Sequence, residues 1–116
     1  MNAFFITATG TGIGKTVLTA GLAFQLKKKG RKVMAVKPVI SGFEDGDLEN
    51  DTALIAASLG LPFNAENINK ISPFRYLAAV SPNLAAAREG REIMPEALLD
   101  FCDKTITNYD LTLIEG

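Results

Sequence analysis

The sequence predicts an α/β fold in which helices flank a parallel β-sheet on both faces. Three observations predict it: an apolar segment at residues 4–7, a glycine-rich loop at residues 8–16 that leads into an apolar helix, and a second apolar segment at Val33–Val36. A strand, a helix and a strand in this order form a βαβ unit, whose two strands are parallel and whose crossover is right-handed. Residues 111–116 add a further apolar strand that ends in a carboxylate and a glycine.

The composition indicates one globular domain and excludes several classes of function. The chain has 116 residues, 47% of them hydrophobic, with 12 Lys and Arg against 13 Asp and Glu. This balance lacks the basic excess that binding to nucleic acid or to an anionic membrane requires. The absence of histidine excludes His-based zinc sites and Ser-His catalysis, and the single cysteine, Cys102, is expected in the apolar core. No apolar run approaches about 18 residues, so we expect a cytoplasmic protein without a membrane span.

The helix after the glycine-rich loop is apolar around most of its circumference. We therefore expect it to pack on the sheet with little exposed surface. It ends at the lysine triplet 27–29 and Gly30. Cations stabilise the negative end of a helix, and glycine suits the left-handed position that follows it.

The middle of the chain predicts one helix between irregular segments. Residues 41–50 are polar and are expected to form a loop. A helix is predicted over residues 51–59, with Asp51 as a plausible N-cap and Gly60 as its stop. Residues 61–80 are expected to be irregular because two prolines interrupt them.

Two further helices precede the last strand. Ser81 and Pro82 predict the start of a short helix through Arg88, and Pro95 predicts the start of a helix through about residue 107. The expected buried side of this second helix consists of Ala97, Leu98, Phe101, Cys102 and Ile106. Because a core strand is usually covered by the element that follows it, we expect residues 1–116 to be the N-terminal part of a single, longer domain.

The glycine-rich loop predicts a phosphate site. A glycine turn between a strand and a helix directs several backbone N–H groups at one point, next to the positive end of the helix dipole. Gly14, Lys15 and Thr16 add an ammonium, which can reach the β- and γ-phosphates of ATP, and a hydroxyl, which can bind Mg²⁺. The pattern indicates a P-loop NTPase-like domain, in a variant form because Thr9 stands where the standard P-loop has glycine.

Two carboxylates and a lysine accompany this loop. Glu115 ends an apolar strand, where an open parallel sheet lines its ligand crevice, and Asp51 begins a helix. With Thr16 they form a set of hard oxygen ligands that suits Mg²⁺. Lys37 follows the second strand at the same edge of the sheet, and a lysine desolvated between cations can have a lowered pKa. Simpler roles remain open: a helix cap for Asp51, a solvated strand end for Glu115 and a snorkelling side chain for Lys37.

The chain resembles the dethiobiotin synthetase family, which makes the cyclic urea of a biotin precursor. The matches follow one another in order: the loop 8–16 resembles G-T-D-T-G-V-G-K-T, residues 37–42 resemble K-P-V-x-S-G, residues 50–54 resemble S-D-A-L, Ser81-Pro82 resembles an S-P helix start, and residues 114–116 resemble the start of V-E-G-A-G-G. Ala8 and Gly10 depart from the family pattern, which has Gly and Asp there.

The resemblance implies a reaction and a set of residues. The family carboxylates 7,8-diaminononanoate with CO₂ or bicarbonate, phosphorylates the carbamate with ATP and Mg²⁺, and closes the ring. It implies catalytic roles for Lys37 and Lys15, substrate contacts for Ser41 and Thr11, and metal contacts for Thr16, Asp51 and Glu115. The implied nucleotide site comprises Gly12, Ile13, Gly14, Lys15, Thr16, Val17, Asp51, Glu115 and Gly116. It also implies a homodimer for the full-length protein, with no nucleic acid or membrane as partner.

Two other functions remain open. The first is a related P-loop ligase that forms amides, similar to the cobyrinate amidotransferases, although residues 37–42 fit the first family better. The second is a regulatory domain of the same fold without catalysis, similar to those attached to some acetyltransferases. A module that only binds ligands need not keep Lys15, Thr16, Asp51 and Glu115, so their presence favours an enzyme.

Overall fold

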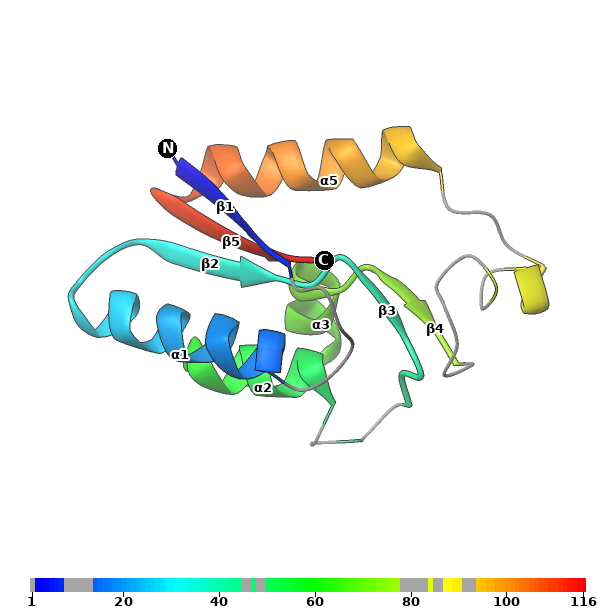
Figure 1. The fold of residues 1–116 in the computed structure, drawn as a ribbon, viewed down its shortest axis with the longest axis horizontal. Helices are drawn as coiled ribbons and strands as arrows, with labels where there is room; N and C mark the ends of the chain where they lie inside the picture. Colours follow the sequence, from blue (N-terminus) through cyan, green and yellow to red (C-terminus); the bar gives the residue numbers. More distant parts are fainter. Residues whose placement is uncertain are drawn as a thin grey trace.

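The computed structural model describes residues 2–7, 14–44, 47, 50–77, 84, 87–90 and 94–116, and all structural statements below refer to them. Strands and helices alternate along much of the chain (Figure 1). The elements are, in order, β1 (Asn2–Ile6), α1 (Gly14–Lys28), β2 (Val33–Val36), β3 (Val39–Ser41), α2 (Asp51–Ser58), α3 (Ala65–Ile71), β4 (Phe74–Tyr76), α5 (Pro95–Asn108) and β5 (Leu111–Glu115).

The main sheet is parallel and has the order β1-β5-β2 among the described strands. Ile6 of β1 lies opposite Glu115 of β5, and Val36 of β2 lies opposite Ile114. The carboxyl ends of all three strands therefore meet at one edge. Every residue of β2 and β5 is buried, as expected for strands covered on both faces.

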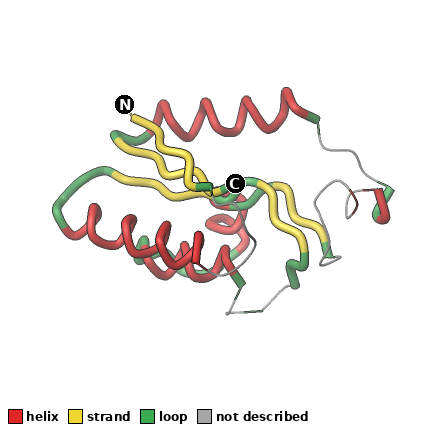
Figure 2. The backbone as a smooth tube through the Cα atoms, viewed as in Figure 1, coloured by secondary structure: helices red, strands yellow, loops and turns green. Residues whose placement is uncertain are grey.

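Helices cover both faces of this sheet, which confirms the expected three layers. Helix α5 lies on one side, and α1 and α2 lie on the other (Figures 1 and 2). Helix α1 contacts β2 and β5, α5 contacts β5, and α2 packs against α1. No helix in the described parts of the chain is long and apolar enough to cross a membrane.

Helix α1 is more exposed than its apolar sequence predicts. The side of α1 that packs inward is formed by Thr16, Thr19 and Ala23, whereas Val17 and Leu18 are more than half exposed. The expectation of little exposed surface is therefore wrong. The sheet and α2 contact α1, but they leave its apolar residues Val17 and Leu18 uncovered among the described residues.

The end of α1 has the predicted glycine but an unpredicted lysine contact. Gly30 has a φ of +82°, and its N–H donates to the carbonyl of Lys27. This confirms the left-handed stop. The Lys27 ammonium donates to the Leu59 carbonyl at the end of α2. The lysine therefore joins two neighbouring helices rather than only stabilising its own.

The N-cap of α2 is Asn50 and not Asp51. The Asn50 side-chain oxygen accepts a hydrogen bond of 2.8 Å from the Ala53 N–H, and Asp51 is the first residue of the helix. Gly60, with a φ of +70°, ends it as predicted. Because Asn50 satisfies the helix end, the Asp51 carboxylate is available for other contacts.

Residues 61–77, the described part of the segment 61–80, are more regular than their two prolines predict. Helix α3 begins after Asn64, which caps it through a bond from the Asn67 N–H, and β4 pairs in parallel with β3. The prolines stand outside these elements, so they do not break them. Strand β3 extends to Ser41, where a loop was expected.

The remaining helices fit the sequence in part. Helix α5 spans Pro95–Asn108, one residue longer than expected, and its inward side includes Cys102, whose pKa is raised by burial and by the nearby Asp103 carboxylate. Leu98, Phe101 and Ile106 are half-buried with it, but Ala97 is exposed and Thr105 is the buried residue. Ser81 and Pro82 lie outside the described residues.

Candidate functional site

The chemically important side chains gather at the carboxyl edge of the main sheet. Glu115 is the last residue of β5, Lys37 follows β2, and Thr16 lies in the first turn of α1. The Gly116 N–H donates to the Ile6 carbonyl, so the end of β1 reaches the same place. This is the edge at which open parallel sheets bind ligands.

Glu115 is a buried carboxylate at the centre of the site, with only 2% of its surface exposed. Its Oε2 atom accepts a hydrogen bond of 2.7 Å from the Thr16 hydroxyl and lies 3.2 Å from the Lys37 ammonium nitrogen. Its Oε1 atom is buried and has no hydrogen-bond partner among the described residues. A buried charge of this kind requires compensation by a cation.

Lys37 joins Glu115 to Asp51. Its ammonium forms an ion pair with Asp51 Oδ2 and a second one with Glu115 Oε2. Burial alone lowers the pKa of Lys37, but the hydrogen bond and negative charge of Asp51, together with those of Glu115, outweigh burial and raise it above its ordinary value. The expected lowering of this pKa is therefore wrong, because carboxylates surround the ammonium where cations were expected.

Lys15 lies beside this cluster without joining it. Its ammonium donates a hydrogen bond of 3.1 Å to the Gly116 carbonyl. Gly14 begins α1, and Val17, also expected at the nucleotide, is exposed on the same helix. The other expected loop residues, Thr11, Gly12 and Ile13, lie outside the described residues.

A cavity of about 500 Å³ brings five of the expected residues together. Its lining includes Lys15, Lys37, Ser41, Asn50, Asp51 and Gly116. Asn50 was not predicted as a lining residue. The signal for it was present, because asparagine before an acidic residue at a helix start is a strong N-cap, and the cap places it next to Asp51.

The donor set at this edge fits a magnesium ion bound with a nucleotide. The described residues hold no group of three or more His, Cys, Asp or Glu side chains that could bind a metal on their own. Asp51, Glu115 and the Thr16 hydroxyl provide hard oxygen atoms, and Mg²⁺ takes its remaining ligands from water and phosphate. The unpaired, buried Oε1 atom of Glu115 agrees with a cation at this position.

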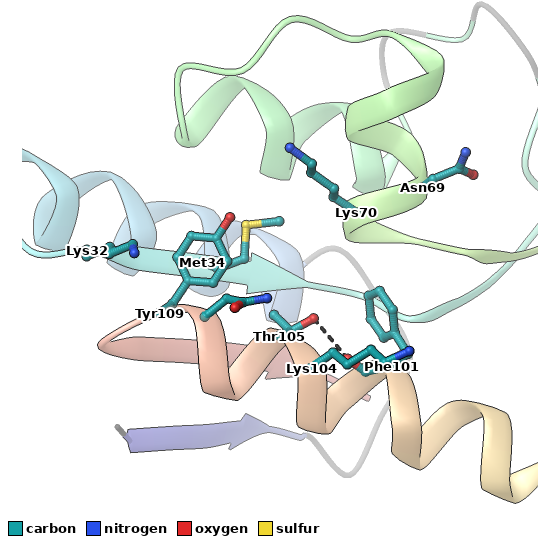
Figure 3. A pocket seen from close by; sticks show the side chains of 9 residues that line it. Lys32, Met34, Asn69, Lys70, Phe101, Lys104, Thr105 and Tyr109 are labelled. Atoms are coloured by element: carbon teal, nitrogen blue, oxygen red, sulfur yellow. Dashed lines mark hydrogen bonds between the residues drawn. The ribbon is translucent and has the colours of Figure 1, made fainter.

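A second cavity, of about 560 Å³, lies between β2, α3 and α5 (Figure 3). Three lysines, 32, 70 and 104, line it. Lys70 is paired with Glu66 and Lys104 with Asp100, each within one helix, and these side chains are more than half exposed. None of the residues expected at the site lines this cavity. Chemistry rather than size therefore assigns the candidate site to the carboxyl edge of the sheet.

Comparison with known proteins shows the family of the chain. The family model described as AAA domain matches residues 2–116. The chain is 42% identical over 110 residues to the ATP-dependent dethiobiotin synthetase BioD of Methylobacterium nodulans, a match that covers 91% of this chain and 49% of that protein. It is 40% identical to the protein of the same name from Caulobacter sp. strain K31, over 100% of this chain and 50% of that protein.

A third relative shows the same relationship in length. The dethiobiotin synthetase of Cellvibrio japonicus is 35% identical, over 98% of this chain and 50% of its own length. The chain thus spans about half the length of the curated relatives it matches. It belongs to the AAA-domain family and is homologous to the ATP-dependent dethiobiotin synthetases.

Proposed function

We propose that the chain serves the ATP- and Mg²⁺-dependent carboxylation and ring closure of 7,8-diaminononanoate with CO₂, which yields dethiobiotin. The observation that supports it most is the cluster of Thr16, Lys37, Asp51 and Glu115 beside Lys15 at one edge of the sheet. A phosphoryl transfer needs positioning and neutralisation of charge, and this cluster supplies both. The names of the homologues, ATP-dependent dethiobiotin synthetases, support the proposal.

The nucleotide end of the site lies at the start of α1. Lys15 neutralises the β- and γ-phosphates once it leaves the Gly116 carbonyl, and the N–H groups of the first turn face the same anion. Thr16, Asp51 and Glu115 hold the metal ion, which neutralises phosphate charge when bound. The buried hydrogen bond from Thr16 fixes the orientation of Glu115 for this purpose.

The substrate end is the cavity beside Lys37 and Ser41. One amine of the substrate adds to CO₂ and loses a proton, which gives a carbamate. A carbamate oxygen then attacks the γ-phosphorus of ATP and ADP leaves. The second amine attacks the carbamate carbon, phosphate leaves and the ring closes. We place the Lys37 ammonium against these anionic groups as a binding cation and not as a general base, because a lysine with an ordinary pKa is protonated near neutral pH.

The proposal extends to the whole protein that such a chain represents. We propose a cytoplasmic ligase of biotin biosynthesis that acts as a homodimer when full-length. The amide-forming ligases are the second candidate, and the position of Lys37 and Ser41 in one cavity, within the segment that resembles K-P-V-x-S-G, favours the first.

The test follows isotope from bicarbonate into product. The chain is incubated with ATP, Mg²⁺, 7,8-diaminononanoate and labelled bicarbonate, and acid-stable label is measured together with ADP. We expect both to depend on the diamine, and both to disappear in Lys15→Ala. Lys32→Ala is the matched control, because Lys32 lines the other cavity. Binding of ATP without any label in an acid-stable product would overturn the proposal.

A further inference from the structure

We propose that the Lys37 ammonium is an internal counter-ion that a divalent cation must displace from Asp51 and Glu115. Binding of the cation and release of Lys37 into the substrate cavity then form a single exchange. This inference rests on the metal site of the proposed function, and it adds that Lys37 competes with the metal before it contacts the substrate.

The same two carboxylates serve both cations. Lys37 pairs with Asp51 Oδ2 and with Glu115 Oε2, and the latter atom also accepts the Thr16 hydroxyl. Among the described residues, we assign the metal only to the side chains of Thr16, Asp51 and Glu115. An ammonium between the two carboxylates therefore stands at the position that a divalent ion needs.

Charge prevents the Lys37 ammonium and a divalent cation from occupying the site between Asp51 and Glu115 at the same time. Asp51 and Glu115 carry two negative charges, and the Glu115 side chain is almost fully shielded from solvent at 1% exposure. One ammonium compensates half of that charge, whereas a divalent ion compensates all of it. Two cations within a few ångströms of one another repel strongly at a partly buried site, so the ammonium leaves when the metal enters.

The released side chain has a place to go. Lys37 lines the 500 Å³ cavity together with Ser41 and Gly42, and its side chain is a flexible stem of four carbons. In the cavity the ammonium meets the anionic group of the substrate. The metal and an anionic substrate consequently favour each other's binding, because each stabilises the released position of Lys37.

Lys15 provides an internal comparison. It carries the same charge and lines the same cavity, but its ammonium contacts the backbone oxygen of Gly116 and is not paired with Asp51 or Glu115. Loss of Lys15 removes a nearby positive charge without removing a competitor for the metal oxygens. A comparison of variants at the two lysines therefore distinguishes direct competition for the metal ligands from a general effect of lost positive charge.

The experiment measures binding of Mn²⁺, the probe for the divalent site, by electron paramagnetic resonance of the free ion. It uses the 116-residue chain without nucleotide at about pH 8. We expect Lys37→Met to bind Mn²⁺ about tenfold more tightly than the unmodified chain, because the competing state is removed. Lys37→Arg should stay close to the unmodified chain, Lys15→Met should gain much less, and Lys32→Met should not change.

Four results would overturn the inference. Unchanged or weaker binding in Lys37→Met shows that Lys37 does not compete, and an equal gain in Lys15→Met shows a general charge effect. Failure of every chain to bind Mn²⁺ removes the metal site of the proposed function along with the inference. In the unmodified chain, Mg²⁺ should shift the ¹³Cε resonance of Lys37 more than that of Lys15, and an unmoved Lys37 resonance in the metal-bound chain contradicts the exchange even if the variants do not fold.

Discussion

The Thr16 hydroxyl donates a 2.7 Å hydrogen bond to the buried carboxylate of Glu115, across 99 positions of sequence. The bond connects the first turn of the helix that follows the glycine-rich loop to the last residue of the central strand. It brings two of the proposed metal ligands into contact before any metal binds. Several expected effects of substitution depend on this connection.

Thr16→Val keeps the shape of the side chain and removes the hydroxyl. Glu115 then loses a buried donor, and we expect the free energy of unfolding to fall by about 1–3 kcal/mol. Urea denaturation measures it. Thr107→Val is the matched control, because the Thr107 hydroxyl donates to a backbone carbonyl on the exposed side of α5. Equal losses in the two variants would contradict a special role for the bond to Glu115.

Asp51→Asn separates the cap of α2 from the metal site. Since Asn50 caps the helix, we expect thermal stability within a few degrees of the unmodified chain, while Mn²⁺ binding weakens at least about tenfold because a hard anionic ligand is lost. Thermal unfolding and Mn²⁺ titration measure the two effects. A large loss of stability with unchanged metal binding would indicate that Asp51 is structural.

Asn50 shows the opposite behaviour. Asn50→Ala removes the hydrogen bond to the Ala53 N–H, and we expect a loss of about 0.5–2 kcal/mol in the free energy of unfolding. Asn50→Asp, which can still accept this bond, should retain most of the stability. If both variants lose the same amount in urea denaturation, the cap assignment is wrong.

The raised pKa of Lys37 predicts a loss of stability in alkali. An ordinary lysine has a pKa of about 10.4, and Lys37 keeps its proton to a higher pH in the folded chain. Its contribution to stability is complete below the unfolded value and disappears as the pH rises through the folded value. Above about pH 10, the midpoint temperature of thermal unfolding should therefore fall more steeply with pH in the unmodified chain than in Lys37→Met. Parallel curves for the two chains would contradict the ion pairs.

Lys37→Ala should separate chemistry from nucleotide binding. The variant loses the cation that we place against the carbamate and the transferred phosphoryl group, so we expect no labelled dethiobiotin. ATP binding should stay within about tenfold of the unmodified chain, because Lys15 and the start of α1 are retained. Product formed at the unmodified rate would remove Lys37 from the mechanism.

The sequence predicted the parts of the fold that depend on local patterns. Buried strands such as Val33–Val36, the stop at Gly30 and the helix from Pro95 follow from apolar runs, glycine and proline. Strand β4, only three residues long, could not be found in this way, because it exists through pairing with β3. The exposure of Val17 and Leu18 was also not predicted, because burial depends on what covers a helix as much as on the composition of the helix.

The candidate site was predictable as a set of residues but not as a network. The order of strand, loop and helix placed Lys37 and Glu115 at one edge of the sheet, as found. The ion pairs that raise the pKa of Lys37 depend on α2 directing Asp51 toward that edge. The N-cap residue Asn50 fixes where α2 begins, whereas the sequence pattern predicted Asp51 as the N-cap.

A crystal structure of the chain with Mn²⁺ and a non-hydrolysable ATP analogue tests the central claim most directly. The account predicts anomalous density for Mn²⁺ coordinated by Thr16, Asp51 and Glu115, with the terminal phosphates against Lys15 and with the Lys37 ammonium moved into the cavity beside Ser41. Density for the metal and nucleotide elsewhere, with Lys37 still between the two carboxylates, would contradict it.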